Sequence, residues 1–138
     1  MSKYRSISHA KFRIHYHLVF STKFRAGALM EIEDELRDMV LSISNSRYSV
    51  VECGVDKNHM HVIVRAKPTI TAGKIVADIK KKSTLWAWEN HRGVMDKHFW
   101  KKRRATDRRT LWTHGYFCES VGNVSYERIL DYVKNQGV

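Results

Sequence analysis

The ten residues from Asp56 to Arg65 constrain the fold of this chain more than any other stretch. They read Asp-Lys-Asn-His-Met-His-Val-Ile-Val-Arg, so a turn-forming triplet leads into a β-branched run typical of a strand. Because successive strand side chains point to opposite faces, His59 and His61 are predicted to share one face while Met60 turns into the core. Imidazole is a common metal ligand, so this face is a candidate metal site. The alternative is a half-exposed polar face without a ligand.

The composition of the chain favours a nucleic-acid-binding protein. Its 138 residues are enough for one domain with one core. Lys and Arg number 25 against 14 Asp and Glu, a formal charge of +11, which is typical of proteins that bind polyanions. We find neither a secretory signal nor an apolar stretch that could span a bilayer, and we expect a cytoplasmic protein. Cys53 and Cys118 stand far apart, which predicts reduced core residues rather than a disulfide or a zinc site.

Hydrophobic periodicity predicts four strands and three helices. The strands cover Phe12–Thr22, Tyr48–Val55, His59–Ala66 and Tyr116–Val121, and the helices cover Met30–Asn45, Thr71–Asn90 and Tyr126–Gln136. The turn at residues 56–58 predicts that the second and third strands form a hairpin. Between His91 and His114 the periodicity fades, and no element is predicted there.

A second pair of histidines lies one residue apart on the first strand. His15 and His17 repeat the spacing of His59 and His61. The favoured interpretation is an ordinary polar face of the sheet. If the two strands pair, these imidazoles would instead lie near the candidate metal site.

Two groups of basic residues are candidates for contact with nucleic-acid phosphates. They are Lys80, Lys81 and Lys82 on the second helix, and Lys101, Lys102, Arg103, Arg104, Arg108 and Arg109 in the aperiodic segment. Trp100 and Trp112 bracket the second group, and flat rings beside cations suit unstacked bases of a single strand. The alternative is that the tryptophans belong to the core and only the cations face outward.

The last helix supplies a candidate chemical partner for the histidines. Tyr132 and Gln136 are four residues apart and therefore lie on one helix face. A tyrosine on a terminal helix is by itself an ordinary amphipathic residue. Beside two imidazoles, however, its hydroxyl can attack a phosphodiester, and a neighbouring amide oxygen can complete a metal sphere.

These motifs, in this order, resemble the small single-tyrosine transposases of the Insertion Sequence 200/605 family, within the HUH endonuclease superfamily. The resemblance covers nearly the whole chain, through residues 16–23, 59–63, 115–117, 121–124 and 132–136. One departure is Asn58, where many relatives carry an acidic residue before the first histidine, so a role for a nearby carboxylate stays open.

The resemblance implies an α+β fold, a ferredoxin-like and RNA-recognition-like sandwich. Its antiparallel central sheet would carry helices on one face, with a C-terminal helix bearing the nucleophile, in one transposase domain over residues 1–138. It also implies a homodimer with composite active sites, in which the terminal helix can cross to the partner. The substrate would be single-stranded DNA at the hairpin-bearing ends of a mobile element.

The resemblance also implies roles for individual residues. His59, His61 and Gln136 would bind a divalent metal, Mg²⁺ or Mn²⁺. Tyr132 would attack the scissile phosphate, so that cleavage and rejoining proceed by transesterification through a 5′-phosphotyrosine.

Two alternatives remain at this point. One is a non-catalytic module of the same shape that binds single-stranded nucleic acid, in which the histidines are incidental. The other keeps the superfamily but changes the biology, to a domesticated nickase that processes repeated palindromes or a replication-initiation nickase. The pairing of Tyr132 with Gln136 favours an enzyme, because binding alone does not require it.

Overall fold

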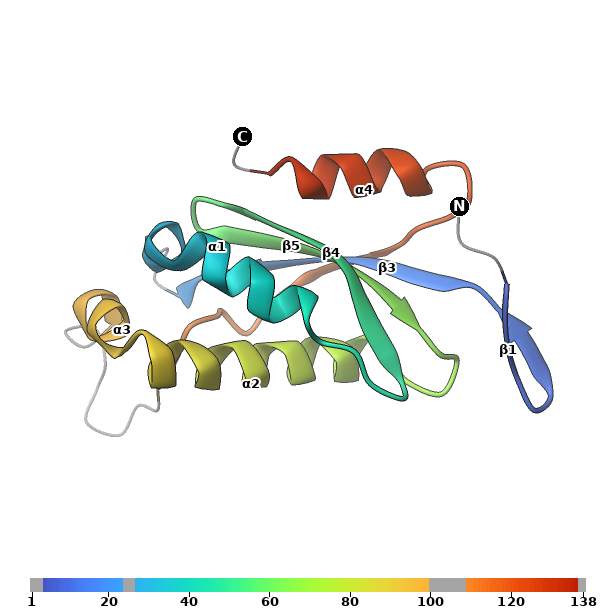
Figure 1. Cartoon of the computed structure of the whole chain (residues 1–138), viewed down its shortest axis with the longest axis horizontal. Helices are drawn as coiled ribbons and strands as arrows, with labels where there is room; N and C mark the ends of the chain where they lie inside the picture. Colours follow the sequence, from blue (N-terminus) through green and yellow to red (C-terminus); the bar gives the residue numbers. More distant parts are fainter. Residues whose placement is uncertain (1–3, 24–26, 100–108, 137–138) are drawn as a thin grey trace.

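A four-stranded antiparallel sheet organises the structure, a computed structural model that describes residues 4–23, 27–99 and 109–136. The strand order is β4-β5-β3-β6, with β3 (Ile14–Ser21), β4 (Tyr48–Asp56), β5 (His59–Ala66) and β6 (Phe117–Ser120). Helices α1 (Ala28–Leu41), α2 (Ala72–Asn90) and α3 (Arg92–Phe99) lie on one side of the sheet, and α4 (Tyr126–Lys134) lies on the other (Figure 1). The predicted α+β fold with an antiparallel sheet is therefore confirmed.

The core fills the space between the sheet and α1 to α3. Met60 and Val62 of β5 and Leu18 and Phe20 of β3 are fully buried, and they alternate with the residues of the opposite face. The helices contribute apolar stripes at helical spacing, namely Ile32, Leu36 and Val40 from α1, and Ile75, Val76 and Ile79 from α2. Met60 thus lies in the core as predicted, which turns its two histidine neighbours to the face that α4 covers.

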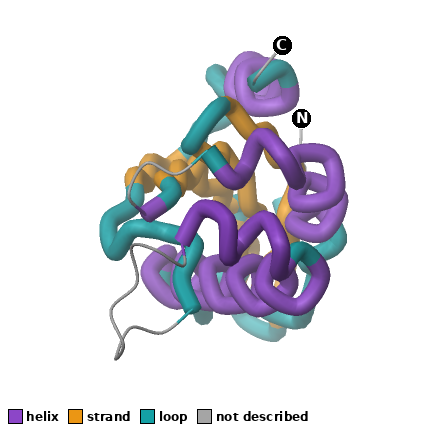
Figure 2. Tube along the Cα trace, turned by 90° about the vertical axis from the view of Figure 1, so that its left-hand side faces the viewer, coloured by secondary structure: helices purple, strands orange, loops and turns teal. Residues whose placement is uncertain are grey.

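Helix α4 stands apart from the other helices, across the sheet (Figure 2). It contacts the sheet through a glycine, since a Cβ built on Gly54 of β4 would lie 1.8 Å from the Val133 carbonyl oxygen and 2.9 Å from the Gln136 Cβ. Val133 is itself fully buried. Only glycine therefore lets the helix backbone rest directly on β4 at this point.

Two structured segments lie where no element was predicted. Strands β1 (Arg5–Ile7) and β2 (Ala10–Phe12) form a separate hairpin, whose three-residue strands are too short for a periodic signal. Helix α3 is eight residues long and buries only Met95 and Phe99, so it also lacks a clear stripe.

Two further expectations differ from the structure. Helix α1 ends at Leu41 rather than Asn45, because the Asn45 side-chain oxygen accepts hydrogen bonds from the backbone of Arg47 and Tyr48 and forms a turn. The expectation that both cysteines are core residues holds for Cys53 and is wrong for Cys118, which is exposed together with the other three residues of β6.

Candidate active site

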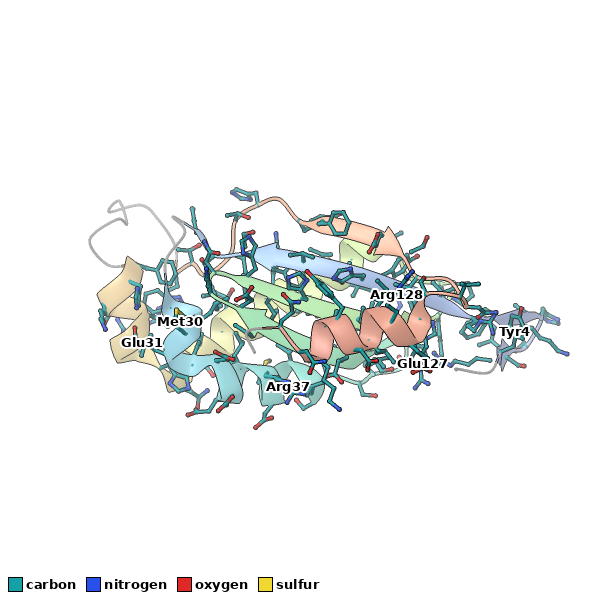
Figure 3. The ribbon with its side chains drawn as sticks, turned by 90° about the horizontal axis from the view of Figure 1, so that it is seen from above. Tyr4, Met30, Glu31, Arg37, Glu127 and Arg128 are labelled. Atoms are coloured by element: carbon teal, nitrogen blue, oxygen red, sulfur yellow. The ribbon has the colours of Figure 1, made fainter. Side chains whose placement is uncertain are left out.

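The two histidines of the opening motif alternate with the buried Met60, and His61 contacts Tyr132 of α4. They therefore lie on the sheet face over which Figure 3 shows α4. In the β3–β5 register His59 is opposite Ser21 and His61 is opposite Val19. His59 is exposed, whereas His61 is partly buried. The predicted shared face is confirmed, and its other members on β3 include His17, two residues from Val19.

A chain of hydrogen bonds connects His61 to a carboxylate on β6. Nδ1 of His17 lies 2.9 Å from Oε1 of Glu119, and Nε2 of His17 lies 3.2 Å from Nδ1 of His61. The two imidazole rings are stacked, with centroids 5.4 Å apart and planes inclined by 23°. His17 is thus held between the edge strand and the candidate metal face.

The direction of these bonds fixes the tautomer of His61. An ionised carboxylate only accepts, so Nδ1 of His17 donates to Glu119; in the imidazole tautomer that carries its single proton on Nδ1, Nε2 of His17 accepts. Nδ1 of His61 then donates to His17, which leaves a lone pair on Nε2 of His61. That nitrogen makes no hydrogen bond within the described part of the chain. The arrangement matches metal-binding histidines, whose second nitrogen is usually held by a hydrogen bond.

The surroundings of His61 also keep its ring neutral. Burial, followed by the nearby His17 and His59 imidazoles, lowers the pKa of His61 to about 4. Only a neutral imidazole can offer a lone pair to a metal. His61 is therefore ready to act as a ligand at neutral pH.

Tyr132 lies beside the same imidazoles. Its ring centroid is 5.6 Å from that of His61 and 6.4 Å from that of His17, with edge-to-face inclinations of 82° and 78°. The tyrosine is 52% exposed, so a bulky substrate can reach it. The structure thus brings together residues that stand more than seventy positions apart in the sequence, and it does so within one chain.

Gln136 completes the set of residues that the sequence pointed to. Its Cβ lies against Gly54, and Gly54 is the cross-strand neighbour of His61. The side-chain Nε2 donates to the Tyr132 carbonyl oxygen at 3.0 Å, which leaves the amide oxygen available.

This donor set fits a divalent metal. Within the described residues no group of three or more His, Cys, Asp or Glu side chains could hold a metal ion. Two imidazoles alone are too few, so further ligands have to be of another type. The amide oxygen of Gln136, water and a DNA phosphate are the oxygen donors that Mg²⁺ and Mn²⁺ accept.

Sequence reasoning did not identify the roles of His17 and Glu119. The favoured interpretation of His17 was an ordinary polar face, and the structure instead shows the alternative, an imidazole beside the site. The one-apart spacing of His15 and His17 was the available signal. Glu119 had none, because its contact depends on β6 pairing with β3, where His17 is opposite Glu119.

The three lysines of α2 have different surroundings. The Lys80 ammonium donates to the carbonyl oxygens of residues 113, 114 and 115 at 2.7, 2.9 and 3.2 Å, which uses all three of its donors. Lys82 forms an ion pair with Asp78 at 2.8 Å, and Lys81 is exposed. All three lie across the sheet from α4 and Tyr132, so any DNA contact that they make is away from the histidines.

The rest of the basic group is only partly described. Arg109 lines a groove of about 420 Å³ together with Lys80 and Lys81. Lys101, Lys102, Arg103, Arg104 and Arg108 lie outside the described residues, as does Trp100.

Trp112 belongs to the core. It is buried against Phe20, and its ring nitrogen donates to the Ser83 hydroxyl at 2.8 Å. The prediction that this ring stacks on bases is therefore wrong for Trp112, because its face is covered by protein.

The model of the family described as "Transposase IS200 like" matches residues 10–136. The chain belongs to the IS200-like transposase family. The family resemblance of the motifs is thereby confirmed. Relatives of this transposase include the transposases for insertion sequence element IS200 of Salmonella typhimurium and Salmonella typhi. Each is 28% identical over 143 aligned positions, which cover 99% of this chain and 85% of the relative.

Two solved structures share the fold of this IS200-like transposase. A putative transposase from Deinococcus radiodurans superposes with a TM-score of 0.70 at 20% identity, covering 97% of this chain and 98% of the other. A REP-associated tyrosine transposase bound to a REP hairpin superposes with a TM-score of 0.58 at 17% identity, covering 96% and 70%. In the described part of the chain, no helix has the length and apolar character needed to cross a membrane.

Proposed function

We propose that this transposase cleaves and rejoins single-stranded DNA at the hairpin-bearing ends of an insertion sequence, with Tyr132 as the nucleophile. The observation that carries the proposal is the position of the Tyr132 ring, 5.6 Å from the ring of His61, whose Nε2 is left free by the hydrogen bonds of Nδ1. A nucleophile and a metal ligand thus face the same solvent-accessible space.

The proposed step is a transesterification. The Tyr132 oxygen attacks phosphorus and loses its proton, the bond from phosphorus to the 3′ oxygen breaks, and that oxygen takes up a proton. The products are a 5′-phosphotyrosine and a free 3′-hydroxyl. The reverse reaction on another 3′ end rejoins the strand without a nucleotide cofactor. Mg²⁺ or Mn²⁺, held by His59, His61 and Gln136, would supply stabilisation of the charge that develops on the phosphate.

Two observations support the proposed partners. The neighbour that is bound to a REP hairpin shares the fold of this chain, which supports a DNA hairpin as the ligand. Strand β6 is one of the two outer strands of the sheet, its four residues are exposed, and Phe117 is 50% exposed. An open strand edge is available for pairing with a second chain, which supports a homodimer, and light scattering of the purified protein tests it.

The test of the activity is the formation of a covalent adduct. End-labelled single-stranded oligonucleotides that tile the DNA flanking the gene are incubated with the protein and Mg²⁺, and the products are separated on a denaturing gel. We expect one or more oligonucleotides to yield an adduct with the protein and a shortened free strand. Tyr132→Phe should retain binding of the same oligonucleotide and yield no adduct.

Two results would contradict the proposal. Cleavage by the Tyr132→Phe variant would exclude this nucleophile. Binding without any adduct, across the complete tiling and with either Mg²⁺ or Mn²⁺, would favour the non-catalytic binding module.

A further inference from the structure

An exposed aromatic ring lies beside the candidate active site on β6, one of the two outer strands of the sheet. The Phe117 side chain is 50% exposed, and its ring centroid lies 5.9 Å from that of His17, with the planes inclined by 73°. The ring centroid of Tyr132 lies 6.4 Å from that of the same imidazole. His17 therefore has two exposed rings as neighbours, the candidate nucleophile and a phenylalanine that the proposed reaction does not use.

The strand register places Phe117 on the same face as His61. Val19 of β3 is opposite His61 of β5 on one side and opposite Phe117 of β6 on the other. Directly opposite residues of antiparallel strands project from the same face, so these three side chains form one row across the sheet. Adjacent strands lie about 4.8 Å apart, so the Cα atoms of His61 and Phe117 are separated by about 10 Å.

Helix α4 leaves the β6 end of this row open. Figure 3 shows α4 over the part of the sheet that β4 and β5 form, and the helix backbone rests on Gly54 of β4. Strand β6 lies at the opposite edge of the sheet. A ligand that reaches Tyr132 can therefore extend across β3 onto the ring of Phe117.

The charge beside Phe117 favours a nucleobase over a phosphate group as its ligand. Glu119 is two residues further along β6 and therefore on the same face. Its side chain is 45% exposed, and its carboxylate lies 2.9 Å from Nδ1 of His17. This anion repels phosphate groups, whereas a nucleobase is uncharged and flat. Nucleobases stack on aromatic side chains with little dependence on sequence.

We propose that Phe117 stacks on the base of a nucleotide beside the bond that Tyr132 cleaves. The inference rests on the proposed function for the identity of the substrate. Nucleotides of a stacked strand advance by about 3.4 Å each, so a separation of about 10 Å from His61 places the stacked base within about three nucleotides of the scissile phosphate. Holding this base fixes the register of the strand against the nucleophile.

A dimer that pairs through β6 would leave the Phe117 ring on this face. Strand pairing uses backbone N–H and C=O groups in the plane of the sheet, whereas side chains project above and below that plane. The alternative ligand of the ring is a side chain of a second copy of the chain. Light scattering of the Phe117 variants tests this alternative.

The first experiment measures affinity for single-stranded DNA. A labelled oligothymidylate is titrated with the full chain, with a chelator in place of divalent metal so that the proposed cleavage cannot proceed. Because one base stack is lost, Phe117→Ala should bind about 5-fold to 150-fold more weakly than wild type. Phe117→Tyr keeps a flat ring and should bind as wild type does. Circular dichroism establishes that each variant is folded.

The second experiment locates the stacked base. In an oligonucleotide that yields the covalent adduct, each nucleotide within about three positions of the cleaved bond is replaced in turn by an abasic analogue. Replacement at one position should weaken wild-type binding as much as Phe117→Ala does, and should leave binding by Phe117→Ala unchanged. Tyr116→Ala is the matched control and should show the wild-type pattern, because Tyr116 is 47% exposed but its ring centroid lies 5.7 Å from the Lys80 ammonium of α2, across the sheet.

The outcomes separate this inference from the proposed function. Equal affinities of wild type and Phe117→Ala would overturn base stacking on Phe117, even if the covalent adduct forms. The same abasic pattern in both proteins, or loss of the sensitive position in Tyr116→Ala, would also overturn it. A changed oligomeric state of Phe117→Ala with an unchanged abasic pattern would assign the ring to an interface between copies. Weaker oligothymidylate binding by Phe117→Ala, without an adduct from any oligonucleotide, would support stacking and contradict the proposed cleavage.

Discussion

Replacing Gly54 by alanine should separate DNA binding from DNA cleavage. The added Cβ would lie 1.8 Å from the Val133 carbonyl oxygen and 2.9 Å from the Gln136 Cβ. The nearest obstacle is backbone, which cannot rotate away as a side-chain end would. Helix α4 therefore has to move, and it carries Tyr132 with it.

The size of the movement follows from ordinary contact distances. A carbon and a carbonyl oxygen approach to about 3.3 Å, so the helix has to retreat by about 1.5 Å from the observed 1.8 Å. A misplacement of about 1 Å at a reacting group reduces a rate by roughly 100-fold. We expect the adduct to form at least 100-fold more slowly, and the free energy of unfolding to fall by about 1–3 kcal/mol, as overpacking usually causes.

The assay is single-turnover formation of the covalent adduct, with DNA affinity measured on the same preparation. Gly93→Ala is the matched control, since a Cβ on Gly93 has nothing within 4 Å, and it should cleave at the wild-type rate. A Gly54→Ala protein that cleaves as fast as wild type would refute the close packing of α4 on β4 as the determinant of the position of Tyr132.

Three other predictions follow from the site and its surroundings. His59→Ala and His61→Ala should each abolish metal-dependent adduct formation. Both variants should keep the wild-type circular dichroism spectrum, because both imidazoles lie across the sheet from the core. A fully active variant would exclude the replaced histidine as a required ligand. Glu119→Gln should weaken Mn²⁺ binding by about 10-fold or more, because an amide no longer fixes the tautomers of His17 and His61. Electron paramagnetic resonance measures the Mn²⁺ affinity. Unchanged affinity would show that the hydrogen-bond chain does not position His61. The free energy of unfolding should fall on acidification from pH 6.5 to pH 4. The pKa of His15 is about 4 in the folded protein and about 6.5 in the unfolded chain. The unfolded chain therefore binds more protons in this window, which favours unfolding. Urea unfolding at pH 7 and pH 4.5 should show a smaller loss for His15→Gln than for wild type, and equal losses would contradict the assignment.

The local parts of the fold could be predicted from the sequence. The strand His59–Ala66 has the predicted bounds, and the first turn of α4 begins at Tyr126 as expected. These segments have a strong period and clear turn residues at their ends, so nearest-neighbour geometry is sufficient. The face shared by His59 and His61 follows from the same alternation.

The parts that depend on tertiary pairing could not be predicted. The hydrogen bond between His17 and Glu119 joins residues 102 positions apart, and it exists because β6 pairs with β3 rather than with another strand. Likewise the Lys80 ammonium donates hydrogen bonds to three backbone carbonyl oxygens. The pattern of charges in the sequence does not predict where these oxygens lie. A basic run indicates that cations are present, but not which of them already have acceptors.

The ion pair of Lys82 and the carbonyl contacts of Lys80 limit how much these two cations can contribute to DNA binding. Of the 25 Lys and Arg side chains counted from the sequence, Lys80 donates to backbone oxygens and Lys82 pairs with Asp78. Such cations attract few mobile anions from solution, so they release few when DNA binds. The counterions displaced by a DNA strand should therefore come from cations without an internal acceptor, and the electrostatic contribution of this protein to binding should be smaller than its composition suggests.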